Sequence, residues 1–269
     1  MAPPQTLALS IVGATGRMGR QVIQAALTTP GFRVVGGVVR PGSPARGTDL
    51  GVLAGREPCG ALATDDLAAA LRPADVVVDF SVPAVTVQAV EAARALGKPI
   101  VIGTTGLSPA DLDRVRQASQ AIPVLLAPNM SVGVNLLLKV LPAIVQALGP
   151  GYDIEIIEAH HRHKRDAPSG TALKLAEAIA QAAGQTAPRL VHGRQGLSPR
   201  QPGEIGVHAV RAGGIVGEHT ILFASEGEEV ALVHRAYSRQ TFAEGALRAA
   251  RFLADKPPGL YSMLDVLAG

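Results

Sequence analysis

The sequence GATGRMG occupies residues 13–19, directly after an apolar stretch that predicts a strand over 7–12 and before a predicted helix over 21–27. Strand, glycine turn and helix in this order are the context that a dinucleotide-binding fingerprint requires. Gly13 would permit the tight turn, Gly16 would let a pyrophosphate approach the backbone, and Gly19 would allow the helix to pack closely on the strand. The alternative is an ordinary glycine-rich turn, but the flanking strand and helix favour cofactor binding.

Strands and helices alternate through the first 130 residues. Further apolar strands are predicted over 32–39, 75–80, 99–102 and 123–127, with helices over 64–71, 83–97 and from Ser108 onward. This alternation predicts a parallel sheet with right-handed crossovers, a Rossmann-type doubly wound α/β domain. Thr64 is the predicted N-cap of its helix, and Ser108 with Asp111 resembles a capping box. Residues 41–63, rich in Gly, Pro and Ala, predict only a surface excursion.

The pattern changes after residue 130. Helices are predicted over 131–148 and 171–183, strands over 152–159, 205–211, 218–225 and 229–237, and a polar loop over 184–203. Strands without intervening helices suggest a mainly antiparallel or mixed sheet in an α+β domain. A last helix, over 241–253, is expected to pack back on the first domain. We therefore expect a dinucleotide-binding domain of residues 1–130, completed by 241–269, and a substrate-binding and oligomerisation domain of residues 131–240.

Composition argues against several functional classes. The net charge of +3 is slight and aromatic residues make up 3% of the chain, so there is no stacking platform for nucleic-acid bases. The single cysteine, Cys59, rules out an internal disulfide and favours a reducing compartment. Without a signal-peptide pattern or an uncharged apolar run of spanning length, we expect a cytoplasmic protein with no membrane partner. Modest positive charge suits a small anionic ligand.

The end of the second strand bears on nucleotide choice. An acid for the ribose hydroxyls is expected there, but the sequence at residues 38–40 is VVR. Arg40 beside the missing acid favours pairing with a 2′-phosphate, and hence NADP over NAD. The alternative is a solvated loop arginine. GTTG, residues 103–106, follows a later strand at the ligand-binding edge of such a sheet, where it either borders the nicotinamide or is a plain turn.

Residues 160–165 read HHRHKR, a cluster that no core buries without a large loss of hydration. A zinc site is disfavoured, because the spacing matches no helical metal pair and the neighbouring cations repel a divalent ion. A solvated basic loop is the simplest alternative. The third interpretation is an acid–base and carboxylate site: histidine titrates near neutral pH, and Lys164 neutralises negative charge. Ser169, Gly170 and Thr171 would offer N–H groups at a helix N-terminus. The dinucleotide turn upstream favours this third interpretation.

These motifs together resemble bacterial 4-hydroxy-tetrahydrodipicolinate reductase, also called dihydrodipicolinate reductase. The segments that carry the resemblance are GATGRMG (13–19), GTTG (103–106), NMSVGVN (129–135), EAHHRHK (158–164), DAPSGTA (166–172), VRAG (210–213) and IVGEHT (215–220). They cover nearly the whole chain, and the histidine stretch is highly specific.

The resemblance implies an oxidoreductase of lysine and diaminopimelate biosynthesis. It would reduce 4-hydroxy-tetrahydrodipicolinate to tetrahydrodipicolinate with NAD(P)H, by hydride transfer to a cyclic imine dicarboxylate and loss of water. Carried over by position, His160 would be the proton donor and Lys164 a second donor or charge stabiliser. His161, Gly170 and Thr171 would bind a substrate carboxylate.

The resemblance also implies a cofactor site and an assembly. The residues that would line the cofactor are Gly13, Ala14, Thr15, Gly16, Arg17, Met18, Gly103, Thr104, Thr105, Ala127, Pro128, Asn129 and Met130. A homotetramer would form through the sheet of the second domain. The chain departs from the family at Val39, where many members carry an acid and use NADH well. With Arg40 beside it, we expect NADPH as the cofactor, with NADH possible but weaker.

The sequence motifs are also compatible with two other functions. One is a different NADP-linked reductase or dehydrogenase on the same two-domain plan, which would leave the loop from His160 to Lys164 idle. The other is a non-catalytic nucleotide-binding sensor, which would bind NADPH without oxidising it.

Overall fold

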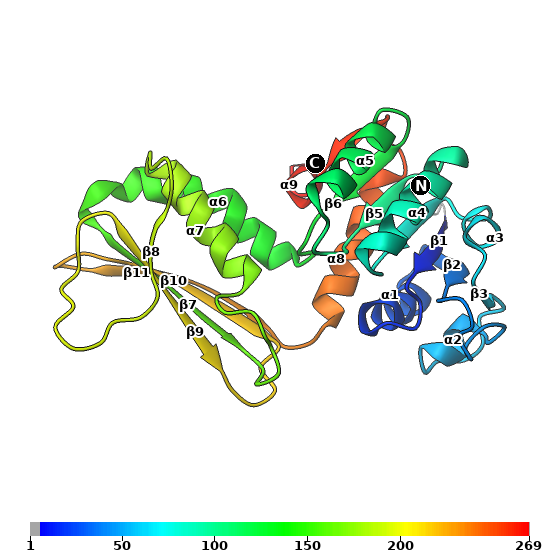
Figure 1. Cartoon of the computed structure of the whole chain (residues 1–269), viewed down its shortest axis with the longest axis horizontal. Helices are drawn as coiled ribbons and strands as arrows, with labels where there is room; N and C mark the ends of the chain where they lie inside the picture. Colours follow the sequence, from blue (N-terminus) through cyan, green and yellow to red (C-terminus); the bar gives the residue numbers. More distant parts are fainter. Residues whose placement is uncertain (1–5, 269) are drawn as a thin grey trace. The chain divides into compact units, whose positions relative to one another are not determined.

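The computed structural model describes residues 6–268, which form two compact units (Figure 1). Unit 1 contains the described residues within Met1–Val132 and Arg239–Gly269, and unit 2 spans Gly133–Ser238. The chain therefore leaves unit 1, builds the whole of unit 2, and then returns to finish unit 1.

Unit 1 is built on a seven-stranded parallel sheet of order β12-β6-β5-β4-β1-β2-β3. Its strands are β1 (Leu7–Val12), β2 (Phe32–Val38), β3 (Ala63–Thr64), β4 (Val76–Asp79), β5 (Ile100–Ile102), β6 (Pro123–Leu126) and β12 (Gly259–Tyr261). The strand order reverses between β1 and β4, so the loops that follow these two strands frame the crevice where doubly wound sheets bind ligands. The predicted Rossmann-type fold is confirmed.

Helices cover both faces of this sheet. They are α1 (Arg17–Thr28), α2 (Leu50–Leu53), α3 (Leu67–Leu71), α4 (Pro83–Ala95), α5 (Pro109–Ser119), α8 (Gln240–Leu253) and α9 (Met263–Val266). The capping box predicted for α5 is present: the Ser108 side chain accepts the Asp111 N–H, and the Asp111 carboxylate accepts the Ser108 N–H.

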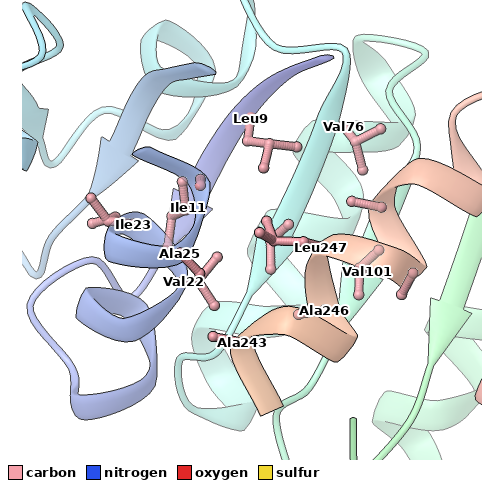
Figure 2. Close-up of a cluster of buried hydrophobic side chains, with 14 of the residues drawn as sticks. Leu9, Ile11, Val22, Ile23, Ala25, Val76, Val101, Ala243, Ala246 and Leu247 are labelled. Atoms are coloured by element: carbon pink, nitrogen blue, oxygen red, sulfur yellow. The ribbon is translucent and has the colours of Figure 1, made fainter. Parts of the chain in front are cut away.

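One face of the sheet is covered by α1 and α8. Figure 2 shows side chains of the sheet and of both helices meeting in one apolar cluster, which includes Leu9, Ile11, Val22, Ile23, Val76, Val101, Ala243, Ala246 and Leu247. Ala243 and Ala246 are fully buried, and such small side chains let α8 approach the sheet closely. The helix predicted over 241–253 thus packs on the sheet of unit 1.

Two local predictions in unit 1 are wrong. Residues 41–63 are not merely a surface excursion, because they contain α2 and the fully buried Leu50. Asp49 organises this segment: its carboxylate accepts backbone N–H groups from both α2 and the turn at Cys59. Thr64 is not the cap of α3. Asp66 lies directly before that helix and its carboxylate accepts the Ala69 N–H at 3.0 Å.

Unit 2 contains a five-stranded mixed sheet of order β11-β10-β7-β9-β8, as predicted. Its strands are β7 (Asp153–His160), β8 (Arg189–Val191), β9 (Glu204–Arg211), β10 (Gly217–Ala224) and β11 (Glu229–Ala236). β7 pairs antiparallel with β10 and parallel with β9. The expected polar loop over 184–203 is interrupted by β8, which pairs with the start of β9.

Helices α6 (Val132–Leu148) and α7 (Gly170–Ala182) pack on one face of this sheet (Figure 1). Leu141 and Leu175 meet Ile156 and Phe223 in its core. Among the described residues, one helical stretch, Val132–Gly151, is long and apolar enough to cross a membrane by length and composition. One side of this stretch, with Leu137, Leu141 and Val145, packs in the core of unit 2, which is the arrangement of an amphipathic helix.

Candidate active site

The glycine turn of unit 1 fits a pyrophosphate. Gly13 has φ +81°, and a Cβ atom there would lie 2.7 Å from the Phe80 carbonyl oxygen. Gly16 precedes α1 without a side-chain capping bond, so the first N–H groups of this helix are not occupied by a cap. A helix N-terminus of this kind attracts phosphate through its N–H groups and its dipole.

The rest of the turn lies beside the end of β2. The N–H groups of Gly13 and Ala14 donate to the Val38 carbonyl oxygen at 3.1 and 3.0 Å. Ala14 is buried, Thr15 and Met18 are half-buried, and Gly16 and Arg17 are exposed. Arg40 lies two residues beyond Val38 and is exposed, whereas Val39 is buried. The structure therefore brings the end of β2, near Arg40, against the glycine turn.

A buried carboxylate joins the loops that follow β4 and β5. Asp79 is fully buried and accepts hydrogen bonds from the Ser81 N–H and the Thr104 hydroxyl, both at 3.0 Å, and from the Thr86 hydroxyl. Burial raises its pKa, and these bonds only partly offset that effect. Thr104 is thus directed inward, while Thr105 is exposed. Hydrophobic periodicity places Asp79 near the end of a strand but does not predict that it joins these two loops.

Gly103 and the segment after β6 complete this edge of unit 1. The Gly103 N–H donates to the Asp79 carbonyl oxygen at 2.8 Å, and the Phe80 ring occupies the space that a side chain at Gly103 would need. Ala127 and Met130 are buried, Pro128 is exposed, and the Asn129 amide oxygen accepts the Ser131 N–H at 2.9 Å. All the predicted cofactor residues therefore lie at the carboxyl ends of β1, β2, β5 and β6.

In unit 2, the predicted histidine stretch surrounds a fully buried carboxylate, Glu158 on β7. Arg211 on β9 binds it with two N–H groups, at 2.7 and 2.8 Å. His160 Nδ1 lies 2.6 Å from Glu158 Oε2, and the Ser169 N–H donates to Oε1 at 2.9 Å. Burial raises the pKa of Glu158, but Arg211, His160 and the Ser169 N–H outweigh it and hold that pKa below its usual value.

His160 is an acid–base group that Glu158 holds in a defined orientation. Its side chain is 12% exposed, and the carboxylate of Glu158 holds Nδ1, which leaves Nε2 as the nitrogen that can exchange a proton. Burial lowers the pKa of His160, although Glu158 acts in the opposite direction. The ring therefore sits in a site where a nearby negative charge would favour its protonated form.

The N-terminus of α7 lies next to this group. Ser169 is its N-cap, and the Ser169 Oγ atom accepts the Ala172 N–H at 3.1 Å. Gly170 and Thr171 occupy the first turn, where N–H groups suit a carboxylate. His219 on β10 is almost fully buried, with Nε2 3.1 Å from the Ser169 Oγ atom.

The remaining predicted residues lie on the loop that follows β7. Lys164 is 21% exposed and pairs with the Asp166 carboxylate at 2.8 Å. The Lys164 N–H donates to the His161 carbonyl oxygen at 3.0 Å, so the loop is a tight turn. His161 is half-buried and its ring lies 6.2 Å from that of the exposed His163. Within residues 6–268, no cluster of three or more His, Cys, Asp or Glu side chains is placed to hold a metal ion.

Comparison with known proteins decides the family. The family models "Dihydrodipicolinate reductase, N-terminus" and "Dihydrodipicolinate reductase, C-terminus" match residues 7–130 and 133–267. The chain belongs to the dihydrodipicolinate reductase family. A 4-hydroxy-tetrahydrodipicolinate reductase from Rubrobacter xylanophilus is 54% identical over 97% of this chain and 98% of the relative. A second, from Anaeromyxobacter dehalogenans, is 50% identical over 96% of both chains.

Solved structures agree with this assignment. A dipicolinate-bound dihydrodipicolinate reductase from Paenisporosarcina sp. TG-14 is 26% identical, with a TM-score of 0.77 over 96% of this chain and 98% of that one. An amine dehydrogenase from Mycobacterium smegmatis, at 14% identity and a TM-score of 0.60 over 96% and 95% of the two chains, shares the fold alone. The resemblance drawn from the sequence motifs is confirmed at the level of the dihydrodipicolinate reductase family.

Three residues of the unit 2 site were missed as individual functional groups, although they lie in segments that carry the family resemblance. In the sequence, Glu158, Arg211 and His219 are ordinary polar positions on strands. They come together only through the pairing of these strands in the sheet. β7 and β10 place His219 opposite Glu158, and β7 and β9 place Arg211 opposite His160. All three could have been found because they lie in the segments EAHHRHK, VRAG and IVGEHT, which carry the resemblance to the dihydrodipicolinate reductase family.

Proposed function

We propose that this protein reduces 4-hydroxy-tetrahydrodipicolinate to tetrahydrodipicolinate with NAD(P)H, in lysine and diaminopimelate biosynthesis. The observation that carries the proposal is the arrangement of His160, Glu158 and Arg211 beside the first turn of α7, in a chain of this family. One nitrogen of His160 is bonded to Glu158, and the other is available for proton transfer. The first turn of α7 adds N–H groups that suit a carboxylate.

His160 would supply the proton of the reduction. Its Nδ1–H is committed to Glu158, so the proton given up by the cationic form comes from Nε2. When bound, the nicotinamide cofactor supplies the hydride that adds to the conjugated ring of the substrate. The negative charge of a dicarboxylate substrate would oppose the effect of burial on the pKa of His160 and favour the protonated, donating form.

Lys164 and the N-terminus of α7 would bind the two carboxylates of the substrate and stabilise the negative charge that develops on its ring. Gly170 and Thr171 offer N–H groups at the positive end of the α7 dipole. Lys164 is paired with Asp166, whose side chain is 59% exposed, so a substrate carboxylate can replace that weak surface partner. With His161 on the same loop, these residues would form the carboxylate site. The dipicolinate bound to the Paenisporosarcina relative is a ligand of the same chemistry.

The cofactor is proposed to be NADPH, with NADH used less well. Arg40 supports this preference, because it is exposed at the end of β2 beside the glycine turn and no acid follows the strand. We expect Arg40→Ser to lower kcat/KM with NADPH about tenfold and to leave kcat/KM with NADH nearly unchanged, since one charge-assisted pair contributes about 1.5 kcal/mol. A wild-type protein that prefers NADH would contradict the preference.

The reaction is tested by following loss of NADPH absorbance with 4-hydroxy-tetrahydrodipicolinate generated in situ. We expect turnover by the wild type and a loss of about 10²–10⁴-fold in His160→Gln, the usual contribution of a general acid. His163→Gln is the matched control, since His163 is an exposed histidine on the same loop. Full activity in His160→Gln would favour a different reductase, and NADPH binding without turnover by the wild type would favour a nucleotide sensor.

We also propose a cytoplasmic homotetramer assembled through unit 2. The sheet face opposite α6 and α7 exposes apolar side chains on β7, β9 and β11. Ile157 on β7 is 41% exposed, Val210 on β9 is 44% exposed and Val233 on β11 is 45% exposed. Covering such a face is a common reason for self-association. Light scattering that gives the mass of a single 27.6 kDa chain at micromolar concentration would refute it.

A further inference from the structure

His219 on β10 is a buried histidine to which the proposed chemistry gives no task. It is 3% exposed and lies on the helix-covered side of the sheet, with Ile221 and Phe223 of the same strand. Its Nε2 atom lies 3.1 Å from the Ser169 Oγ atom. Its ring also meets the ring of His160 edge to face, with the ring centres 5.3 Å apart.

An apolar residue in place of His219 would avoid the free-energy cost of burying an unpaired polar atom. The Nδ1 atom of His219 is buried and forms no hydrogen bond within the described residues, and burying an unsatisfied polar atom is unfavourable. Burial lowers the pKa of His219 to about 4, so the ring is neutral near pH 7 and is no acid for the reaction. The hydrogen bond to Ser169 is therefore the specific contribution of this histidine.

Ser169 connects the two halves of the unit 2 site. Its hydroxyl caps α7 by accepting the Ala172 N–H, and its own N–H donates to the carboxylate of Glu158. The same carboxylate holds His160. A displacement of Ser169 would therefore change the distance between the first turn of α7 and the imidazole of His160.

We infer that His219 is a positioning residue that fixes Ser169 against Glu158 and thereby sets the spacing between the α7 N-terminus and His160. This inference rests on the proposed function, because it takes the α7 N-terminus as the site for a substrate carboxylate. His219 acts through Ser169 and touches neither substrate nor cofactor.

The test compares His219→Leu with His219→Gln. Leucine removes the hydrogen bond and retains apolar volume, whereas glutamine keeps a polar group at the reach of Nε2. We expect His219→Leu to raise KM for 4-hydroxy-tetrahydrodipicolinate and Kd for dipicolinate by about 3–10-fold, the loss of one hydrogen bond. We expect kcat to change less than KM, the Kd of NADPH to be unchanged, and His219→Gln to recover most of the loss.

Two controls separate positioning from general damage. His234→Leu removes the histidine directly opposite on β11, whose ring lies 6.3 Å from that of His219, and should leave both constants within about twofold of the wild type. In a Ser169→Ala background, His219→Leu should add almost nothing, because the two residues act through one bond. Equal losses in the wild-type and Ser169→Ala backgrounds would overturn the inference, as would an equal loss in His234→Leu.

The proposed function and this inference fail differently. A wild type that neither turns over the substrate nor binds dipicolinate would refute the proposed function. An active wild type whose dipicolinate affinity is matched by His219→Leu would leave the function intact and refute the positioning role alone.

Discussion

Replacing Arg211 by leucine should strongly destabilise unit 2. Arg211 makes two hydrogen bonds to Glu158, which is fully buried, and its guanidinium also donates to the carbonyl oxygens of Val210 and Asp166. Charge centres about 4 Å apart attract by about 4 kcal/mol at an effective dielectric constant of ~20. Removing one partner of a buried pair costs about 3–5 kcal/mol, because the other charge stays buried without compensation.

The assay is calorimetric unfolding with and without NADPH. The cofactor should raise the transition of unit 1, to which it is expected to bind, and so distinguish it from that of unit 2. For a unit of roughly 100 residues, 3–5 kcal/mol corresponds to a fall in Tm of more than about 10 °C. Arg235→Leu is the control, because its pair with Glu218 is exposed on both sides, at 52% and 41%, and should be worth less than about 1 kcal/mol.

The double variant Glu158→Gln with Arg211→Leu gives the decisive comparison. If the cost of Arg211→Leu arises mainly from an uncompensated carboxylate, neutralising Glu158 should restore part of the lost stability. The electrostatic explanation fails if Arg211→Leu costs less than about 1 kcal/mol, or if the double variant is no more stable than the single one.

Three further predictions follow from the two sites. In Glu158→Gln the pKa of His160 should fall further, because burial lowers this pKa and Glu158 opposes that effect. In a pH profile, the decrease of kcat/KM with rising pH should then begin at a lower pH than in the wild type, and an unchanged profile would exclude His160 as the titrating acid. Burial lowers the pKa of His219 from 6.5 to about 4, so the free energy of unfolding should decrease by about 3 kcal/mol as the pH falls from 6.5 toward 4. His219→Gln, measured by denaturation over the same range, should lack this decrease, and a decrease equal to that of the wild type would contradict the lowered pKa of His219. Gly13→Ala should weaken NADPH binding at least tenfold in a fluorescence titration, because φ is +81° and the new Cβ would lie 2.7 Å from the Phe80 carbonyl oxygen; unchanged affinity would exclude a role for the turn.

The architecture could be predicted from the sequence where the pattern is local. Apolar runs bounded by glycine turns and polar loops predict five of the seven strands of unit 1. The other two, β3 and β12, are two and three residues long, too short to show a period. The segment around Asp49 differs from the predicted surface excursion for a related reason. Its order comes from one carboxylate that binds backbone N–H groups on both sides of a loop, and such a network leaves little trace in hydrophobicity.

The candidate site divides in the same way. His160, Lys164 and Gly170 could be named from the sequence because an unusual run of polar residues and a helix start lie within a dozen positions. Glu158 and Arg211 are 53 residues apart and meet only through the pairing of β7 with β9. Register between distant strands depends on tertiary packing, so sequence spacing did not predict the buried ion pair.

The return of the chain to unit 1 has a consequence for synthesis on the ribosome. When residue 132 has been made, the nascent chain has β1 and β4–β6 but lacks α8, which covers one face of their sheet, and β12, which pairs with β6. All of unit 2 must be translated before these elements exist. The apolar face that α8 will cover therefore stays open during translation, an interval in which chaperones would find a binding surface and in which a chain that stops early would aggregate.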